Sequence, residues 1–219
     1  MKYESVLIIG LGQYGRHLAL DFAKRGLSVM VLSSGEEAVN QIAPYVTDAQ
    51  IGDGTNPAVL KGLGVSDFDV CFVTVGEDFQ SSLITTSLLK ELGAKYVVSK
   101  ATDEIQEKFL LRNGADEVVF PERDIAEKTA VRFSSNNILD FIQIGNEYSI
   151  FQIPVPVPWI GATLQALNIR KKFAVNVLAV EAADGHIDAM PGADYQFHNG
   201  DKLLILGKSD DVARLTRRL

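Results

Sequence analysis

Residues 6–37 of the chain, VLIIGLGQYGRHLALDFAKRGLSVMVLSSGEE, decide the fold class. An apolar run leads into the spacing Gly10-x-Gly12-x-x-Gly15, and an amphipathic segment and a second apolar run follow. In such a strand–turn–helix context the first glycine permits a tight turn, the second lets a phosphate approach the backbone, and the third lets the helix pack on the sheet. The free amides and the positive dipole end of the helix favour an anion. We therefore expect a nucleotide site; the alternative is a βαβ turn with a purely structural role.

The second apolar run ends at Ser33, where dinucleotide-binding proteins usually carry a carboxylate that accepts both ribose hydroxyls. A serine can form only weaker hydrogen bonds there. Loss of the acid can signal recognition of a 2′-phosphate, but no Arg or Lys follows, and Glu36 and Glu37 would repel that phosphate. NADP is therefore not favoured, and we expect weakened ribose recognition.

Apolar runs alternate with amphipathic ones through residue 120, which predicts an α/β fold with a Rossmann-like, doubly wound parallel sheet. The predicted strands are SVLIIG, SVMVLS, AQIGD, DVCFVTV, YVVSK and EVVF. After Pro121 we expect a smaller α+β unit. Its predicted elements are a helix over 122–142, a strand over 148–155, one short helix over 163–173, a strand–turn–strand, a last strand and a helix beginning at Ser209. The predicted lobes are residues 1–135, including the helix after Pro121, and 140–219.

Composition limits the classes of function. The formal net charge of −7 over 219 residues argues against binding of nucleic acid or anionic membranes. Residues 148–169 carry no charge, but Pro154, Pro156 and Pro158 interrupt them, which excludes a membrane helix. We see no signal-peptide pattern before the first strand and expect a cytoplasmic protein. The single Cys71 lies in a buried-strand pattern and is expected to be a small core side chain.

Polar residues follow several predicted strands at the carboxyl edge of the sheet, where ligands of open α/β sheets bind. Asp53 and Thr55 in GDGTN could reach an adenosine, or could belong to a turn that caps the helix after Asn56. Lys100 could meet a phosphate. Glu122 could contribute to the same site or simply favour the N-terminus of its helix.

Catalytic candidates are weak. Tyr96 and Lys100 have the tyrosine–lysine spacing of short-chain dehydrogenases, but here they lie on a predicted strand, about 13 Å apart, rather than on a helix. His17, His186 and His198 have no Cys or carboxylate at metal-binding spacing. We therefore expect a protein that is not an enzyme; a stand-alone NAD(P)-dependent oxidoreductase is the alternative.

Three longer phrases add a resemblance to a known family. LGVSDFDVCFVTVGED, LLKELGAKYVVSKA and NGADEVVFPERDIAEKTA, together with the glycine loop, resemble the KtrA/TrkA family of potassium-transport regulators over the whole chain. The resemblance implies the RCK (regulator of potassium conductance) architecture, with a nucleotide-binding N-lobe and a dimerising C-lobe. It also implies a cytosolic subunit that gates a separate membrane potassium channel, commonly as a dimer-built ring of eight. The implied ligand is ATP or ADP, or NAD(H) in some members.

The same resemblance implies roles for individual residues. The implied nucleotide-binding positions are Gly10, Gly12, Gln13, Tyr14, Gly15, Ser33, Asp53, Thr55, Lys100 and Glu122, with Glu122 also a candidate ligand for a divalent cation near the dimer seam. Gln13 replaces an arginine that often reaches the terminal phosphate of the neighbouring subunit's nucleotide, and Ser33 replaces an acid. Both replacements weaken the discrimination of ATP from ADP. A regulator that has lost nucleotide binding is a further alternative.

The second lobe resembles, in WIGATLQALNIRKKFAVNVLAV, the segment that binds cyclic di-AMP in some relatives. Leu164, Ile169 and Arg170 stand at matching positions, whereas Gln165 and Asn176 depart from the pattern. The alternative is a dimerising lobe without a ligand.

Overall fold

The computed structural model describes residues 3–75, 78–133, 137–144 and 147–217. The chain forms two compact units, Met1–Arg123 and Asp124–Leu219. The helix α6 (Pro121–Phe133) has residues in both of them. The division into lobes at residues 1–135 and 140–219, which assigns this helix to the first lobe, stays a prediction.

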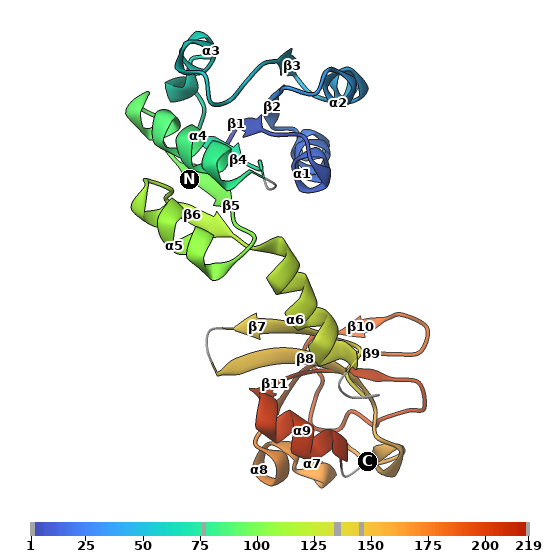
Figure 1. Ribbon diagram of the computed structural model, residues 1–219. Helices are drawn as coiled ribbons and strands as arrows, with labels where there is room; N and C mark the ends of the chain where they lie inside the picture. The colour runs from blue at the N-terminus through green and yellow to red at the C-terminus, as the bar shows by residue number, and fades with distance from the viewer. Residues whose placement is uncertain (1–2, 76–77, 134–136, 145–146, 218–219) are drawn as a thin grey trace. The chain divides into compact units, whose positions relative to one another are not determined.

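The first unit is the expected Rossmann-like sheet (Figure 1). Its elements are β1 (Ser5–Ile9), α1 (Gln13–Lys24), β2 (Ser28–Ser33), α2 (Glu36–Ile42), β3 (Asp48–Ile51), α3 (Pro57–Gly62), β4 (Val70–Val73), α4 (Phe79–Glu91), β5 (Val97–Lys100), α5 (Glu104–Arg112) and β6 (Glu117–Val119), with 3₁₀ turns at Ala43–Tyr45 and Val65–Asp67. The strand order is β3-β2-β1-β4-β5-β6 and every pair is parallel. All six carboxyl ends therefore meet at one edge of the sheet.

Helices cover both faces of this sheet, and β1 shows why its sequence is apolar throughout. Val6 and Ile8 pack in one buried cluster with Ala19 of α1 and Ile42 of α2. Leu7 and Ile9, on the opposite face, pack in a second cluster whose buried members include Leu60 of α3 and Leu89 of α4. β1 is thus buried on both faces, and its successive residues alternate between two hydrophobic cores, as expected for an inner strand of a parallel sheet. The predicted doubly wound fold is confirmed.

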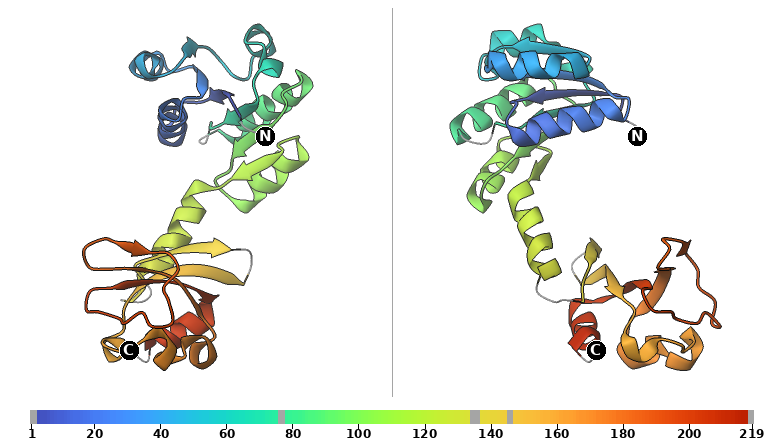
Figure 2. Two further views of the ribbon diagram at one scale, coloured as in Figure 1. Left: turned by 180° about the vertical axis from the view of Figure 1, so that it is seen from behind. Right: turned by 90° about the vertical axis from the view of Figure 1, so that its right-hand side faces the viewer.

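The second unit is built on an antiparallel sheet. Its elements after α6 are β7 (Asp140–Ile144), β8 (Tyr148–Pro154), a 3₁₀ turn (Val157–Trp159), α7 (Leu164–Leu167), α8 (Ile169–Phe173), β9 (Asn176–Glu181), β10 (Ile187–Asp188), β11 (Lys202–Lys208) and α9 (Ser209–Arg217). The strand order is β10-β9-β11-β8-β7. Helices α7, α8 and α9 lie on one face of the sheet (Figure 2). Their apolar side chains join those of β8 and β11 in a single core.

Two details of the second unit differ from the sequence prediction. The predicted helix over 122–142 is wrong at its end, because Asp140–Ile144 form β7 and pair antiparallel with β8. This pairing buries Phe141, whose ring stacks on that of Phe151 at 6.0 Å. The predicted single helix over 163–173 is divided into α7 and α8 by Asn168, which has a left-handed backbone with φ of 48°.

The uncharged stretch at 148–169 does not form a membrane helix. It contains β8, the 3₁₀ turn with the buried Trp159, and α7. Within the described parts of the chain, no helix has both the length and the apolar character needed to cross a bilayer.

Candidate nucleotide-binding site

The glycine loop follows β1 in the middle of the first sheet, and packing requires two of its glycines. Gly10 has φ of 98°, and a Cβ there would lie 3.0 Å from Val75. A Cβ on Gly15 would lie 2.2 Å from the carbonyl oxygen of Gly10 and 2.4 Å from Thr74 Oγ1. The buried Thr74 hydroxyl donates to the Gly10 carbonyl at 2.6 Å and lies 3.1 Å from that of Ile9. The loop is thus held in one shape by β4 and by the close approach of α1.

Gly12, the middle glycine of the motif, leaves the start of α1 open. Gly12 is the N-cap residue of α1, makes no side-chain cap, and a Cβ there would meet nothing within 4 Å. Gln13 is exposed, Tyr14 is half-buried, and the first turn contains no acidic residue. The first turn of a helix has amides without intrahelical partners, and its dipole end is positive. This end of α1 can therefore receive an anionic group close to the backbone, as the spacing predicts.

Ser33 ends β2 at the position where weak ribose recognition is expected, and that expectation stays a prediction. Ser33 is half-buried, and its hydroxyl accepts only a long 3.4 Å hydrogen bond from the amide of Gly35. Glu36 and Glu37 form the first turn of α2 and line a hollow together with Asn40 and Gln41. Such a carboxylate-lined surface disfavours a 2′-phosphate.

Asp53 and Thr55 form a local turn after β3. One carboxylate oxygen of Asp53 accepts the amide of Thr55 at 2.8 Å and its hydroxyl at 2.7 Å. These hydrogen bonds, chiefly the one from the amide, lower the pKa of Asp53. The side chain of Asn56 caps α3 by accepting from the amide of Ala58. The capping turn and an acid at the ligand edge are therefore both present, although the Thr55 hydroxyl is already engaged by Asp53.

Lys100 and Glu122 meet at the carboxyl ends of β5 and β6. Lys100 Nζ lies 2.6 Å from Glu122 Oε1. The hydrogen bond with Lys100 lowers the pKa of Glu122, so the pair is ionic. Arg123 lies over the ring of Phe120 and pairs with Glu107 of α5 at 3.2 Å. The predicted phosphate-binding lysine is therefore at the expected edge, and its present partner is the predicted cation ligand.

The proposed second-ligand residues belong to the second unit and differ in their surroundings. Ile169 is 3% exposed and lies in the core. Leu164 is half-buried and packs against the same core. Arg170 is exposed at the surface. Of the three, Arg170 alone offers an accessible charged group.

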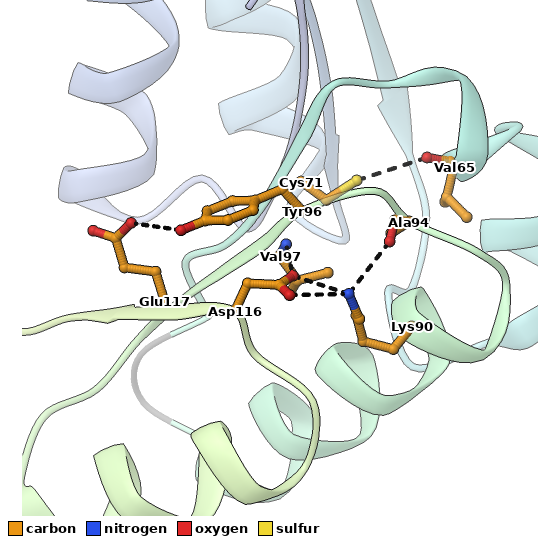
Figure 3. Close-up of polar contacts among 8 residues, drawn as sticks. All are labelled: Val65, Cys71, Lys90, Ala94, Tyr96, Val97, Asp116 and Glu117. Atoms are coloured by element: carbon orange, nitrogen blue, oxygen red, sulfur yellow. Dashed lines mark hydrogen bonds and ion pairs between the residues drawn. The ribbon is translucent and has the colours of Figure 1, made fainter. Parts of the chain in front are cut away.

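Tyr96 lies at the amino-terminal edge of the sheet, just before β5, and Lys100 ends that strand, so the two do not form a dehydrogenase pair. Figure 3 shows the polar contacts at this edge. Tyr96 donates to Glu117 at 3.1 Å, and Asp116 accepts from Lys90 at 2.9 Å and from the amide of Val97 at 2.7 Å. These contacts join β5, β6 and α4 and have a structural role.

The described residues contain neither a reactive cysteine nor a cluster of metal ligands. Burial raises the pKa of Cys71 to about 12, so its thiol is not nucleophilic at neutral pH. Across the residues that the structure describes, no three His, Cys, Asp or Glu side chains are arranged to hold a metal ion.

Thr74, which fixes the glycine loop from 64 residues away, was not among the residues predicted from the sequence. The only signal was its position near the end of the predicted fourth strand, two residues before Gly76. A hydroxyl there is as compatible with a solvent contact as with a loop support.

Comparison with known proteins identifies both parts of the chain. Residues 6–121 match the TrkA-N domain family, and residues 148–219 match the TrkA-C domain family. The chain is 36% identical over its full length to the Ktr system potassium uptake protein C of Bacillus subtilis, covering 98% of that protein. It is 32% identical to the Ktr system potassium uptake protein A of the same organism, with 98% of this chain and 96% of that protein covered.

Solved structures show the same fold. The RCK domain of GsuK aligns with a TM-score of 0.69 at 18% identity, covering 99% of this chain and 47% of that one. The GsuK channel bound to NAD aligns with a TM-score of 0.51 at 21% identity, covering 98% of this chain and 38% of that one. GsuK bound to ADP aligns over 62% of this chain and 36% of the other, with a TM-score of 0.53 at 15% identity. The present chain thus spans less than half the length of the GsuK chains.

Proposed function

The chain belongs to the family that combines a TrkA-N with a TrkA-C domain and includes the Ktr potassium uptake proteins, and on that basis we propose that it is a nucleotide-binding regulatory subunit of a potassium uptake system. Its partner is then a membrane-embedded potassium channel or transporter subunit, and its place is the cytoplasmic face of the membrane. Regulation, not catalysis, is its proposed activity.

The open N-terminus of α1 carries this proposal. Gly12 leaves space in front of the first turn, while Thr74 and the packing of Gly15 fix the loop behind it. Lys100 adds a cationic side chain at the same edge of the sheet. This edge of the sheet suits a nucleotide whose phosphates lie on the glycine loop. The helix end and the Lys100 ammonium group are positive, and Asp53 follows another strand at the same edge.

An adenine nucleotide is the proposed ligand, with ADP and ATP first and NAD(H) as the alternative. Glu36 and Glu37 act against NADP, and the neutral Gln13 can donate an amide hydrogen bond but no charge to a terminal phosphate. A divalent cation would have to share Glu122 with Lys100. A cyclic dinucleotide in the second unit would rely on Arg170.

Oligomerisation is part of the proposal, because the second unit exposes large apolar side chains. On α6, Ile125 and Phe133 are 62% and 76% exposed, and on β7 Ile142 and Ile144 are 62% and 47% exposed. Such surfaces mark contacts with further subunits. We propose a dimer that builds a larger ring. A nucleotide can then regulate the channel only if it binds two states of the assembly with different affinity.

The proposal is tested by calorimetric titration with ADP, ATP and NADH. The unmodified chain should bind at least one of them, and Gly12→Val should abolish binding, because the branched side chain fills the space in front of α1. Gly62→Val is the matched control, since Gly62 is exposed and a Cβ added there would also meet nothing within 4 Å. No heat of binding for any of the three ligands, or equal binding by Gly12→Val, would contradict the proposal. Sustained oxidation of NADH would favour the oxidoreductase instead.

A further inference from the structure

The two partners of the Lys100–Glu122 ion pair differ greatly in their exposure to solvent. The side chain of Lys100 is 12% exposed, whereas that of Glu122 is 60% exposed. An ammonium group that is mostly removed from water requires an anionic partner, while an exposed carboxylate can return to water at small cost. Lys100 therefore depends on an anion at this position, but that anion does not have to be Glu122.

Lys100 is also close enough to the glycine loop to meet part of a bound nucleotide. β5 is the second neighbour of β1 in the sheet, with β4 between them. Two strand spacings separate their carboxyl ends by about 10 Å. A phosphate chain that begins at the α1 N-terminus and the long side chain of Lys100 can together cover such a separation.

Glu122 occupies the first turn of α6, and this helix continues along the chain into the second unit. Pro121–Arg123 belong to the first unit, and the residues from Asp124 onward belong to the second. Lys100 holds this turn through Glu122, and Glu107 of α5 holds it through Arg123 at 3.2 Å. Only the first of these two ion pairs involves a residue of the proposed nucleotide site.

We propose that the Lys100–Glu122 pair is a ligand-responsive latch, in which a nucleotide phosphate replaces Glu122 on the Lys100 ammonium and releases the first turn of α6. This inference rests on the proposed function, because it requires a nucleotide at the glycine loop. The exchange of Glu122 for a phosphate on Lys100 would then couple the nucleotide site to α6. Nucleotide binding and the Glu122 contact are then mutually competitive.

Binding of ADP and AMP to four proteins tests the exchange, with EDTA present so that a cation on Glu122 cannot contribute. Glu122→Gln removes the competing charge and should tighten ADP binding about fivefold, the equivalent of about 1 kcal/mol. Lys100→Met should reduce the preference for ADP over AMP. Glu107→Gln makes the same change of charge in the other ion pair and should leave the affinity for ADP within twofold of that of the unmodified chain.

Hydrogen exchange of peptides that cover residues 119–133 provides a readout that does not depend on affinity. ADP should increase exchange in α6 of the unmodified chain, and Glu122→Gln without ligand should already show the increased rate. If the unmodified chain binds ADP but Glu122→Gln binds it equally or more weakly, Glu122 does not compete with phosphate and the latch is wrong, while the proposed function stands. If the unmodified chain binds no nucleotide, both are wrong.

Discussion

A small side chain added at Gly15 should reduce the stability of the protein, whereas one added at Gly12 should reduce its affinity for ADP. In Gly15→Ala, the new Cβ would lie 2.2 Å from the Gly10 carbonyl oxygen, well inside the 3.0 Å that real Cβ contacts respect. The backbone of the loop or the start of α1 must therefore move. Two contacts this short place the overpacking cost in the upper part of its usual range, about 2–3 kcal/mol, and the preference of helices for Ala over Gly returns about 1 kcal/mol. We expect a net loss of about 1–2 kcal/mol, which lowers the melting temperature of a unit of this size by roughly 4–8 °C.

Gly12→Ser places its side chain in open space. A serine at the N-cap accepts hydrogen bonds from the amides of the first turn, which favours the helix by a few tenths of a kcal/mol. It also occupies the amides that a phosphate needs. Loss of one charge-assisted hydrogen bond, about 1.5–3 kcal/mol, should weaken ADP binding roughly ten- to hundredfold.

The assay combines thermal unfolding followed by circular dichroism with calorimetric titration of ADP. Gly15→Ala should lose stability, and Gly12→Ser should keep its stability but lose affinity. A Gly15→Ala protein that melts with the unmodified chain, or a Gly12→Ser protein that binds ADP with unmodified affinity, would refute this account of the loop.

Three further outcomes follow from the site. Gln13→Arg should raise the preference for ATP over ADP by about ten- to hundredfold, through a charge-assisted hydrogen bond to the terminal phosphate; paired dissociation constants test this, and a preference above tenfold in the unmodified chain contradicts it. The pKa of Asp53 is lowered on folding, so its contribution to stability is complete above its unfolded pKa of 3.8 and is lost as the pH falls through the lower folded pKa. Asp53→Asn should therefore flatten the dependence of the unfolding free energy on pH below about pH 4, and an unchanged slope would exclude this role. Cys71 should resist alkylation at pH 8 until the first unit unfolds, and rapid modification of the native protein would show that the strand is not buried.

The pattern of apolar residues was sufficient to predict the order of helices and strands in the first unit, but not in part of the second. The strands of a parallel sheet buried on both faces read as short apolar runs between glycines, so the order of elements could be predicted. Residues 138–142 have an apolar character that also suits the end of a helix. Their strand state depends on pairing with β8 and on the contact between Phe141 and Phe151, which no local pattern reveals.

The site shows the same division between local and distant information. The turn at Gly10, the open position at Gly12 and the buried Gly15 follow from one spacing, and the structure agrees with each expectation. The support from Thr74 and the pairing of Lys100 with Glu122 depend on which strands become neighbours and in what register. The sequence could place Lys100 and Glu122 at one edge but could not predict that they neutralise each other.

The support of the glycine loop by Thr74 also bears on synthesis of the chain. A nascent polypeptide that has emerged only through β2 already contains the entire glycine spacing and α1. It lacks β4, and with it the hydroxyl that fixes the Gly10 carbonyl from 64 residues away. At a translation rate of about 5–20 residues per second, the residues from Ser34 to Thr74 take roughly 2–8 s to appear. Nucleotide should therefore be unable to assist the earliest folding of its own binding loop, and should act later by slowing the separation of β1 from β4.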